Sequence, residues 1–179
     1  MNVLVVYESI YGNTRAVAEA VADGLGEAEV VPVCEAQNRA AGADLLVVGG
    51  PTHMHGLATT RSRQMAVEAV HEDGGAHVEA GAAEGPGLRA WLRDLPAGES
   101  APAAAFDTRV DKSLWLTGVA SRGIAKRLRH RGYELLGTES FLVEDSEGPL
   151  AEGELDRARD WARSLARSLG TGSAQQAAG

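Results

Sequence analysis

VLVVYESIYGNT, residues 3–14, joins an apolar run to a short polar loop, and a helix-forming segment follows it as far as Leu25. A strand, a hydroxyl-rich loop and a helix start form an anion site, because the first helical N–H groups lack partners inside the helix and the helix dipole favours negative charge there. Gly12 lets the backbone approach a ligand, and Ser9, Asn13 and Thr14 add side-chain donors. The segment therefore predicts a phosphate site. The alternative is an ordinary turn in which Ser or Asn caps the helix.

This loop resembles the phosphate loop of flavodoxins, which bind flavin mononucleotide (FMN) through a Ser/Thr-x-Thr/Tyr-Gly-Asn-Thr segment after the first strand. Ser9, Gly12, Asn13 and Thr14 stand where the family has them. The resemblance implies FMN as cofactor, and it implies that the phosphate is bound by Ser9, Tyr11, Gly12, Asn13 and Thr14, with Ile10 as a further cofactor contact.

Apolar runs and helix-like segments alternate along the rest of the chain. The strands are expected at Val3–Tyr7, Glu29–Cys34, Asp44–Gly49, Pro102–Phe106 and Tyr133–Leu142, and the helices at Thr14–Leu25, Gly87–Leu95, Ala120–Arg131 and Glu152–Leu169. Such alternation predicts an α/β protein with a parallel sheet covered by helices on both faces. The resemblance to flavodoxins specifies a doubly wound five-stranded sheet with strand order 2-1-3-4-5.

Residues 1–169 are predicted to form one flavodoxin-like domain. The stretch Leu57–Pro86 does not fit a minimal alternating pattern and is interpreted as an insertion after the third strand, with Thr60–Val70 able to form a helix. A connection of this length is usually functional or mobile. The segment Gly170–Gly179 has no charge and no large apolar residue, so a disordered tail is expected there.

A second candidate loop follows the third strand, and the resemblance implies that it contacts the isoalloxazine ring. Thr52 is similar to a phosphate or ribityl contact of the family, and His53 stands where many members have Trp or Tyr. The predicted contacts are Pro51, Thr52, His53, Met54, His55 and Gly56. His53 and His55 also suggest a metal pair, but no nearby cysteine or ordered acidic cluster completes a site, so no metal is expected.

A third candidate loop follows the fourth strand, where the resemblance implies the second ring contact. The predicted contacts are Asp107, Thr108, Arg109 and Trp115. A cation at Arg109 would stabilise an anionic reduced flavin by Coulomb attraction, whereas the alternative is an ion pair with Asp107 or Asp111. Trp115 either covers the ring or belongs to the core at the start of the next helix.

Composition excludes several classes of function. The 179 residues carry a net charge of −8, which argues against nucleic acids and anionic membrane surfaces and is compatible with basic protein partners. With Cys34 as the one cysteine, neither an internal disulfide nor a cysteine-based zinc or iron–sulfur site is possible. Neither a secretory signal nor a membrane-spanning apolar stretch is recognised, so a cytoplasmic protein without membrane insertion is expected.

The leading hypothesis from the resemblance is an electron carrier that uses FMN between a reductase and an acceptor protein, with no catalytic residue of its own. The first alternative is an FMN-dependent NAD(P)H:quinone-type oxidoreductase, whose substrate pocket would include the two histidines and the insertion. The second is a flavin-free binding module of the same fold.

Overall fold

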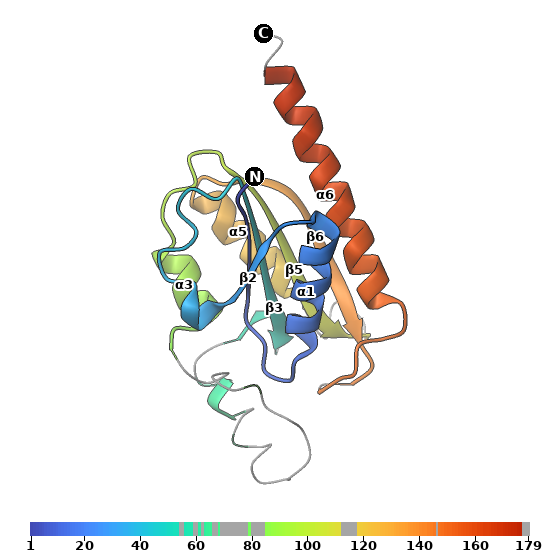
Figure 1. Ribbon diagram of the computed structural model, residues 1–179. Coiled ribbons are helices and arrows are strands. Elements are labelled where there is room, and N and C mark those ends of the chain that lie inside the picture. The colour runs from blue at the N-terminus through green and yellow to red at the C-terminus, as the bar shows by residue number, and fades with distance from the viewer. Residues whose placement is uncertain are drawn as a thin grey trace.

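The strand at the start of the chain, β1 at Val3–Tyr7, lies inside a parallel sheet in the computed structural model. The structure describes residues 1–53, 56–58, 61, 63–65, 68, 79, 85–111, 118–145 and 147–176. β1 pairs with β2, Glu29–Pro32, on one side and with β3, Leu45–His53, on the other. β5, Pro102–Val110, and β6, Glu134–Val143, continue the sheet, so its strand order is β2-β1-β3-β5-β6 (Figure 1).

This order confirms the predicted flavodoxin-like topology, with β5 and β6 as the predicted fourth and fifth strands. Every pairing along the path is parallel. The additional short strand β4, Gly56–Leu57, runs antiparallel to the end of β3.

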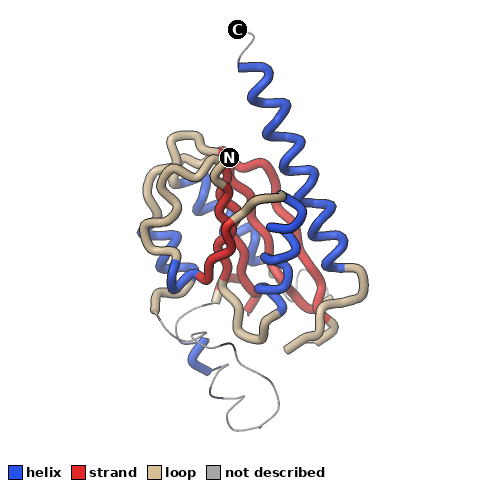
Figure 2. Tube along the Cα trace, viewed as in Figure 1, coloured by secondary structure: helices blue, strands red, loops and turns tan. Residues whose placement is uncertain are grey.

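Helices cover both faces of the sheet, as Figure 2 shows. The core against one face contains residues of α1, Asn13–Leu25, and α6, Glu154–Gln176. The core against the other face contains residues of α3, Leu88–Asp94, and α5, Ala120–His130. The parallel sheet is therefore covered by helices on both faces, as the alternation of segments predicted, and it has the doubly wound order that the resemblance implied.

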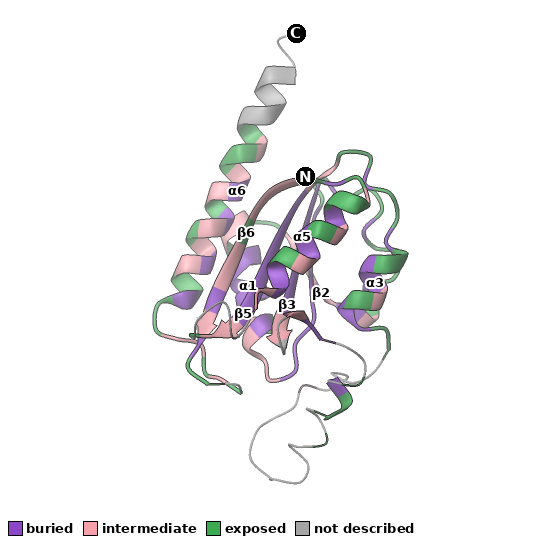
Figure 3. Cartoon of the chain, turned by 180° about the vertical axis from the view of Figure 1, so that it is seen from behind, coloured by how far each residue is buried: buried purple, intermediate pink, exposed green. Residues whose placement is uncertain are grey.

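The alternation of side chains along β1 explains why both faces are needed. Leu4 and Val6 belong to the core under α3 and α5, whereas Val3 and Val5 belong to the core under α1 and α6. Successive side chains of a strand point to opposite faces, and all four of these residues are buried. Figure 3 shows that buried residues predominate along the central strands of the sheet. An apolar run without alternation thus identified a strand buried on both sides.

Two strands extend beyond their predicted ends. β3 continues to His53 rather than Gly49, and β5 continues to Val110 rather than Phe106. The two extensions pair with each other, with Gly50 opposite Asp107 and Pro51 opposite Thr108. Pairing between strands therefore outweighs the weak strand preference of glycine and proline here.

Other boundaries also differ from the sequence-based prediction. β2 ends at Pro32, and Val33–Glu35 form a 3-10 turn (η1) instead of continuing the strand to Cys34. α6 continues through Gln176, so the predicted disordered tail does not begin at Gly170. None of the helices in the described ranges combines the length and apolar character needed to cross a bilayer.

The predicted insertion is described only in part. Leu57 belongs to β4, and Arg61, Arg63–Met65 and Glu68 are helical, as expected for that portion. The rest of 59–84 lies outside the described residues, apart from Glu79. The backbone N–H of Glu79 donates to the carbonyl of Ile10 (2.9 Å), which places this residue beside the loop after β1.

The outer edge of β6 is occupied in its second half by the segment that follows it. The carbonyl of Ser140 accepts a hydrogen bond from the Arg157 guanidinium, and the N–H of Leu142 donates to the Glu154 carboxylate (2.7 Å). The carbonyl of Leu142 accepts the N–H of Ala151 (2.9 Å). These contacts fix the start of α6 against the edge of the sheet.

Candidate functional site

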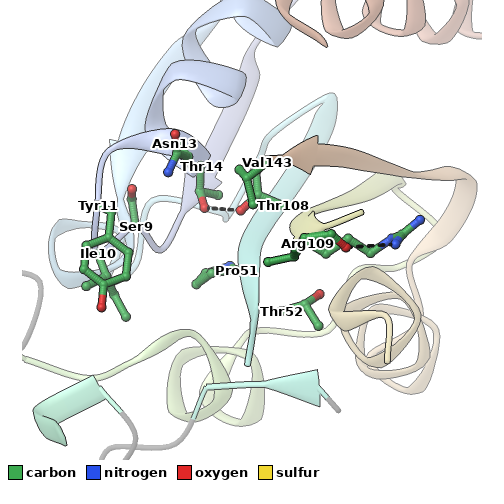
Figure 4. Close-up of a pocket in the computed structure, with 11 residues that line it drawn as sticks. Ser9, Ile10, Tyr11, Asn13, Thr14, Pro51, Thr52, Thr108, Arg109 and Val143 are labelled. Carbon is green, nitrogen blue, oxygen red and sulfur yellow. Dashed lines mark hydrogen bonds between the residues drawn. The ribbon is translucent and has the colours of Figure 1, made fainter. Parts of the chain in front are cut away.

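A pocket of about 100 Å³ opens where β1, β3 and β5 end (Figure 4). In open parallel sheets, ligands bind outside the carboxyl ends of the strands, where the strand order reverses. The three predicted loops meet here. The lining residues are Ser9, Ile10, Tyr11, Asn13, Thr14, Pro51, Thr52, Thr108, Arg109, Val110 and Val143.

The loop after β1 is shaped by Gly12, whose φ of +89° lies in the left-handed region that favours glycine. Its N–H donates to Ser9 Oγ (3.1 Å), and its carbonyl accepts the N–H of Ala16 (2.9 Å), which is the first bond along α1. The amides of Asn13, Thr14 and Arg15 therefore precede the first intrahelical bond, as in an anion site. The helix has no side-chain cap, so the alternative of an ordinary Ser or Asn cap is wrong.

Thr14 and Thr108 join the first and third loops. Their hydroxyl oxygens lie 2.8 Å apart, and both residues are buried (Figure 4). One hydroxyl hydrogen makes this bond, so the other is left to donate to a ligand. Likewise, Ser9 Oγ accepts from Gly12 and keeps its own hydrogen.

Asn13 and Tyr11 face the turn after β6 as well as the pocket. The Asn13 side-chain amide donates to the carbonyl of Glu147 (2.9 Å). Burial raises the pKa of Tyr11, and the charge of Glu147 adds to this rise. The amide of Asn13 therefore fixes the loop to its neighbour, a role that the sequence did not predict.

In the second loop, Pro51 and Thr52 line the pocket. The Thr52 hydroxyl donates to Asp107 Oδ2 (3.2 Å) and accepts the N–H of Ala120 (3.0 Å). His53 and Gly56 pair with each other across β3 and β4, and Gly56 is not among the lining residues. Met54 and His55 lie outside the described residues.

In the third loop, Thr108 and Arg109 line the pocket, and the Arg109 guanidinium donates to the carbonyl of Val110 (3.3 Å). Asp107, predicted to contact the cofactor, is fully buried beside Thr108 and is not among the lining residues. Its carboxylate accepts hydrogen bonds from Thr52 and from the N–H of Ser121. Trp115 lies outside the described residues.

Four residues at the site were missed by sequence reasoning. Val110 and Val143 line the pocket as apolar residues at strand ends, a position with no chemical signature in the sequence. Glu79 forms an ion pair with Arg15 (3.0 Å) beside Gly12. Glu8 is buried directly after β1 and accepts the N–H of Leu88, which ties the loop to α3.

The electrostatics of Glu8 follow from this position. Burial raises the pKa of Glu8, and the Leu88 N–H and the charge of Arg63 oppose this rise. No group of three His, Cys, Asp or Glu side chains able to hold a metal ion occurs within the described ranges.

The donors of the pocket fit the phosphate end of FMN. The hydroxyl groups of Ser9, Thr14 and Thr108 and the amides at the start of α1 lie at one end of the pocket, and such donors bind a phosphate well. The volume of about 100 Å³ holds a few groups of water size rather than a whole FMN molecule. The flavin ring would therefore extend beyond this pocket.

Comparison with known proteins agrees with this geometry. The flavodoxin family model matches residues 5–83, which include the first two loops. Oxidised flavodoxin 2 from Bacillus cereus is similar with a TM-score of 0.61 and 19% identity, over 94% of this chain and 99% of that chain. No curated protein sequence matches the chain.

Two further solved structures have the same fold. A flavodoxin from the domain Archaea has a TM-score of 0.60 and 17% identity, over 95% of this chain and 99% of that one. The flavodoxin, WrbA-like protein from Agrobacterium tumefaciens has a TM-score of 0.59 and 19% identity, over 95% of this chain and 98% of that one. At these identities the structural likeness shows a shared fold.

Proposed function

We propose that the chain is a flavodoxin that binds FMN and carries electrons between a reductase and an acceptor protein in the cytoplasm, because the flavodoxin family model matches residues 5–83 and the fold is that of flavodoxins. The observation that carries the proposal is the convergence of a donor-rich loop, at the start of α1, with the ends of β3 and β5 in one pocket. When bound, FMN accepts and releases electrons, and the protein supplies binding, orientation and electrostatics.

The proposed phosphate contacts are the hydroxyl groups of Ser9 and Thr14 and the amides at the start of α1. Gly12 keeps the backbone open toward the ligand. Each charge-assisted hydrogen bond contributes about 1.5–3 kcal/mol, so a few such donors are enough to anchor a phosphate. The proposed role of Ile10, Tyr11 and Asn13 is to form the wall of this end of the pocket.

The proposed ring contacts come from the second and third loops. Pro51, Thr52, Thr108 and Arg109 line the pocket on that side, and the charge of Arg109 favours the addition of electrons to a nearby flavin. The proposed ring contacts also include His53, Met54, His55, Gly56 and Trp115, as the resemblance to flavodoxins implies.

The first test is whether the purified full chain binds FMN. A titration of flavin-free protein followed by flavin fluorescence should give saturable binding, with the absorption bands of a bound flavin. Riboflavin, which lacks the phosphate, is the matched control ligand and should bind more weakly. Equal binding of the two would contradict the phosphate site.

The second test separates the carrier from the alternative enzyme. With NADPH and a separate flavodoxin reductase, the FMN-loaded protein should pass electrons to a small haem protein. Without the reductase, it should consume neither NADH nor NADPH when a quinone is present. Rapid turnover under the second condition would favour the NAD(P)H:quinone-type oxidoreductase instead.

A further inference from the structure

The side chain of Asp107 is a buried carboxylate of which one oxygen accepts hydrogen bonds and the other does not, among the residues that the structure describes. It is fully buried near the end of β5. Its Oδ2 accepts hydrogen bonds from the Ser121 N–H (2.7 Å) and from the Thr52 hydroxyl (3.2 Å). Its Oδ1 is buried and has no hydrogen-bond partner within the described part of the chain. Burying a carboxylate in this way is costly, so its presence requires an explanation.

The bonds of Asp107 join three elements of the proposed site. Thr52 belongs to β3, Asp107 to β5, and Ser121 to the first turn of α5. The Thr52 hydroxyl also accepts the N–H of Ala120 (3.0 Å). The N–H of Ala120 thus donates to Thr52 and the N–H of Ser121 to Asp107. These bonds take the place of a side-chain cap, which Val119, the residue before the helix, does not provide.

The carboxylate lies directly behind the pocket wall. Thr52, its hydrogen-bond partner, and Thr108, its neighbour in the chain, both line the pocket, whereas Asp107 does not. The favourable end of the α5 dipole offsets part of the cost of this charge. Because the Asp107 carboxylate is fully buried, water screens its negative charge poorly, and this charge lies next to the proposed ring site.

We propose that Asp107 is a positioning residue that holds Thr52 and the start of α5 in place, and that its carboxylate lowers the reduction potential of the bound flavin. The proposal rests on the FMN function proposed above. A nearby negative charge opposes the addition of electrons to the flavin, so it acts against the charge of Arg109. The third loop would then set the potential through two opposed charges.

The decisive variant is Asp107→Asn, which keeps the shape of the side chain and an oxygen that can accept the Ser121 N–H. Its affinity for FMN should stay within about threefold of the wild type. The midpoint potential of its flavin should become more positive, because the negative charge is removed. The matched control is Asp23→Asn, which removes an exposed charge near the end of α1, whereas the pocket lies at the start of that helix; it should leave the potential near that of the wild type, because distance, water and salt screen the charge. Equal potentials for Asp107→Asn and the wild type would overturn the proposed electrostatic role.

Positioning is tested in flavin-free protein by hydrogen exchange at the Ser121 amide. Exchange should be faster by about tenfold or more in Asp107→Ala and close to wild type in Asp107→Asn. Unchanged protection in Asp107→Ala would refute the positioning role. If that variant does not fold, exchange in Asp107→Asn as fast as in an unbonded amide would refute it, because the amide oxygen keeps an acceptor for the Ser121 N–H. If the wild-type chain binds no FMN, the proposed function is wrong, and the exchange measurement then judges the positioning role alone.

Discussion

Thr14 is the side chain on which the phosphate assignment depends most directly. It is buried, and its hydroxyl is hydrogen-bonded to that of Thr108. This bond uses one of the two hydroxyl hydrogens, so the other can donate to a ligand. Thr14→Val, which removes the hydroxyl and keeps the shape, should weaken FMN binding by about 1.5 kcal/mol, or roughly tenfold. Thr14→Ser keeps the hydroxyl and should bind FMN almost as well as the wild type. A fluorescence titration of the three proteins checks this, and equal affinity for the valine variant would contradict the assignment.

Glu154 provides a test of stability against pH. Burial alone would raise the pKa of Glu154, but hydrogen bonds from Arg157 and from the N–H of Leu142 outweigh burial and lower it. A lowered pKa in the folded state means that folding favours the ionised form. The resulting stability is present above the ordinary value of about 4.5 and is lost as the pH falls through the folded-state pKa.

Glu154→Gln should therefore lower the free energy of unfolding at pH 7 by about 1.5 kcal/mol, and this difference should shrink as the pH falls below about 4.5. Urea denaturation at several pH values measures it. The control is Asp160→Asn, which breaks an exposed ion pair with Arg163 and should cost less than about 0.5 kcal/mol. A loss that does not change with pH would show that the charge of Glu154 is not responsible.

The sequence predicted the residues of the loop after β1 better than the role of Asp107. In the loop after β1, Ser9, Asn13 and Thr14 were predicted from the sequence and line one pocket, because polar donors at a helix start have a recognisable sequence; Gly12 shapes this loop but does not line the pocket. Asp107 was placed in the right loop, but its side chain turns toward α5. That direction depends on where α5 begins in space, which sequence spacing does not specify.

Among the strands, β3 and β5 pack closely where Gly49 lies opposite Phe106. A Cβ added at Gly49 would lie 2.0 Å from Cζ of Phe106. Gly49→Ala should lower the free energy of unfolding by about 3 kcal/mol or more, because the ring has no room to move in a packed core. Gly137 in β6 is the matched control, since its nearest neighbours would lie 3.9 Å from the new methyl group. Urea denaturation should find Gly137→Ala as stable as the wild type; comparable losses in both variants would refute the steric account.

The predicted insertion reaches the phosphate loop through Glu79. Its N–H bonds to Ile10, and its carboxylate pairs with Arg15 beside Gly12. Glu79→Gln keeps the backbone bond and removes a negative charge near the proposed phosphate site. FMN affinity should rise about twofold at low ionic strength and less at high salt.

The matched variant is Glu19→Gln, which removes the other, more exposed carboxylate that pairs with Arg15. Its effect on FMN affinity should be smaller, because Glu19 lies one turn further along α1. An equal rise in affinity in both variants would mean that only net charge matters, and weaker binding in Glu79→Gln would show that the ion pair is needed to shape the loop.

Helices and strands were predicted more reliably than their ends. The apolar run of β1 and the amphipathic spacing of α1 are local signals, and both segments form as expected. The added lengths of β3 and β5 arise from pairing between Pro51 and Thr108, residues far apart in the sequence. Local propensity contains no information about such partners.

The protein as a unit carries a net charge of −8, which bears on its proposed partners. Electron transfer to a basic haem protein should slow by roughly tenfold between low and high ionic strength, because salt screens the attraction that brings the two proteins together. Stopped-flow measurements with a basic and an acidic acceptor check this. The acidic acceptor should respond in the opposite direction, and a rate to the basic acceptor that does not vary with salt would exclude electrostatic steering.

The occupied edge of β6 has a consequence for behaviour in concentrated solution. A strand recruits a second chain through a row of open backbone donors and acceptors, which is how many proteins begin to aggregate. Around Ser140 and Leu142 this row is already bonded to the chain's own Arg157, Glu154 and Ala151. At the opposite edge, β2 is short and ends in Pro32, which has no N–H to offer. The folded protein is therefore expected to resist strand-to-strand aggregation during storage and crowding, with its vulnerable apolar strands exposed only after unfolding.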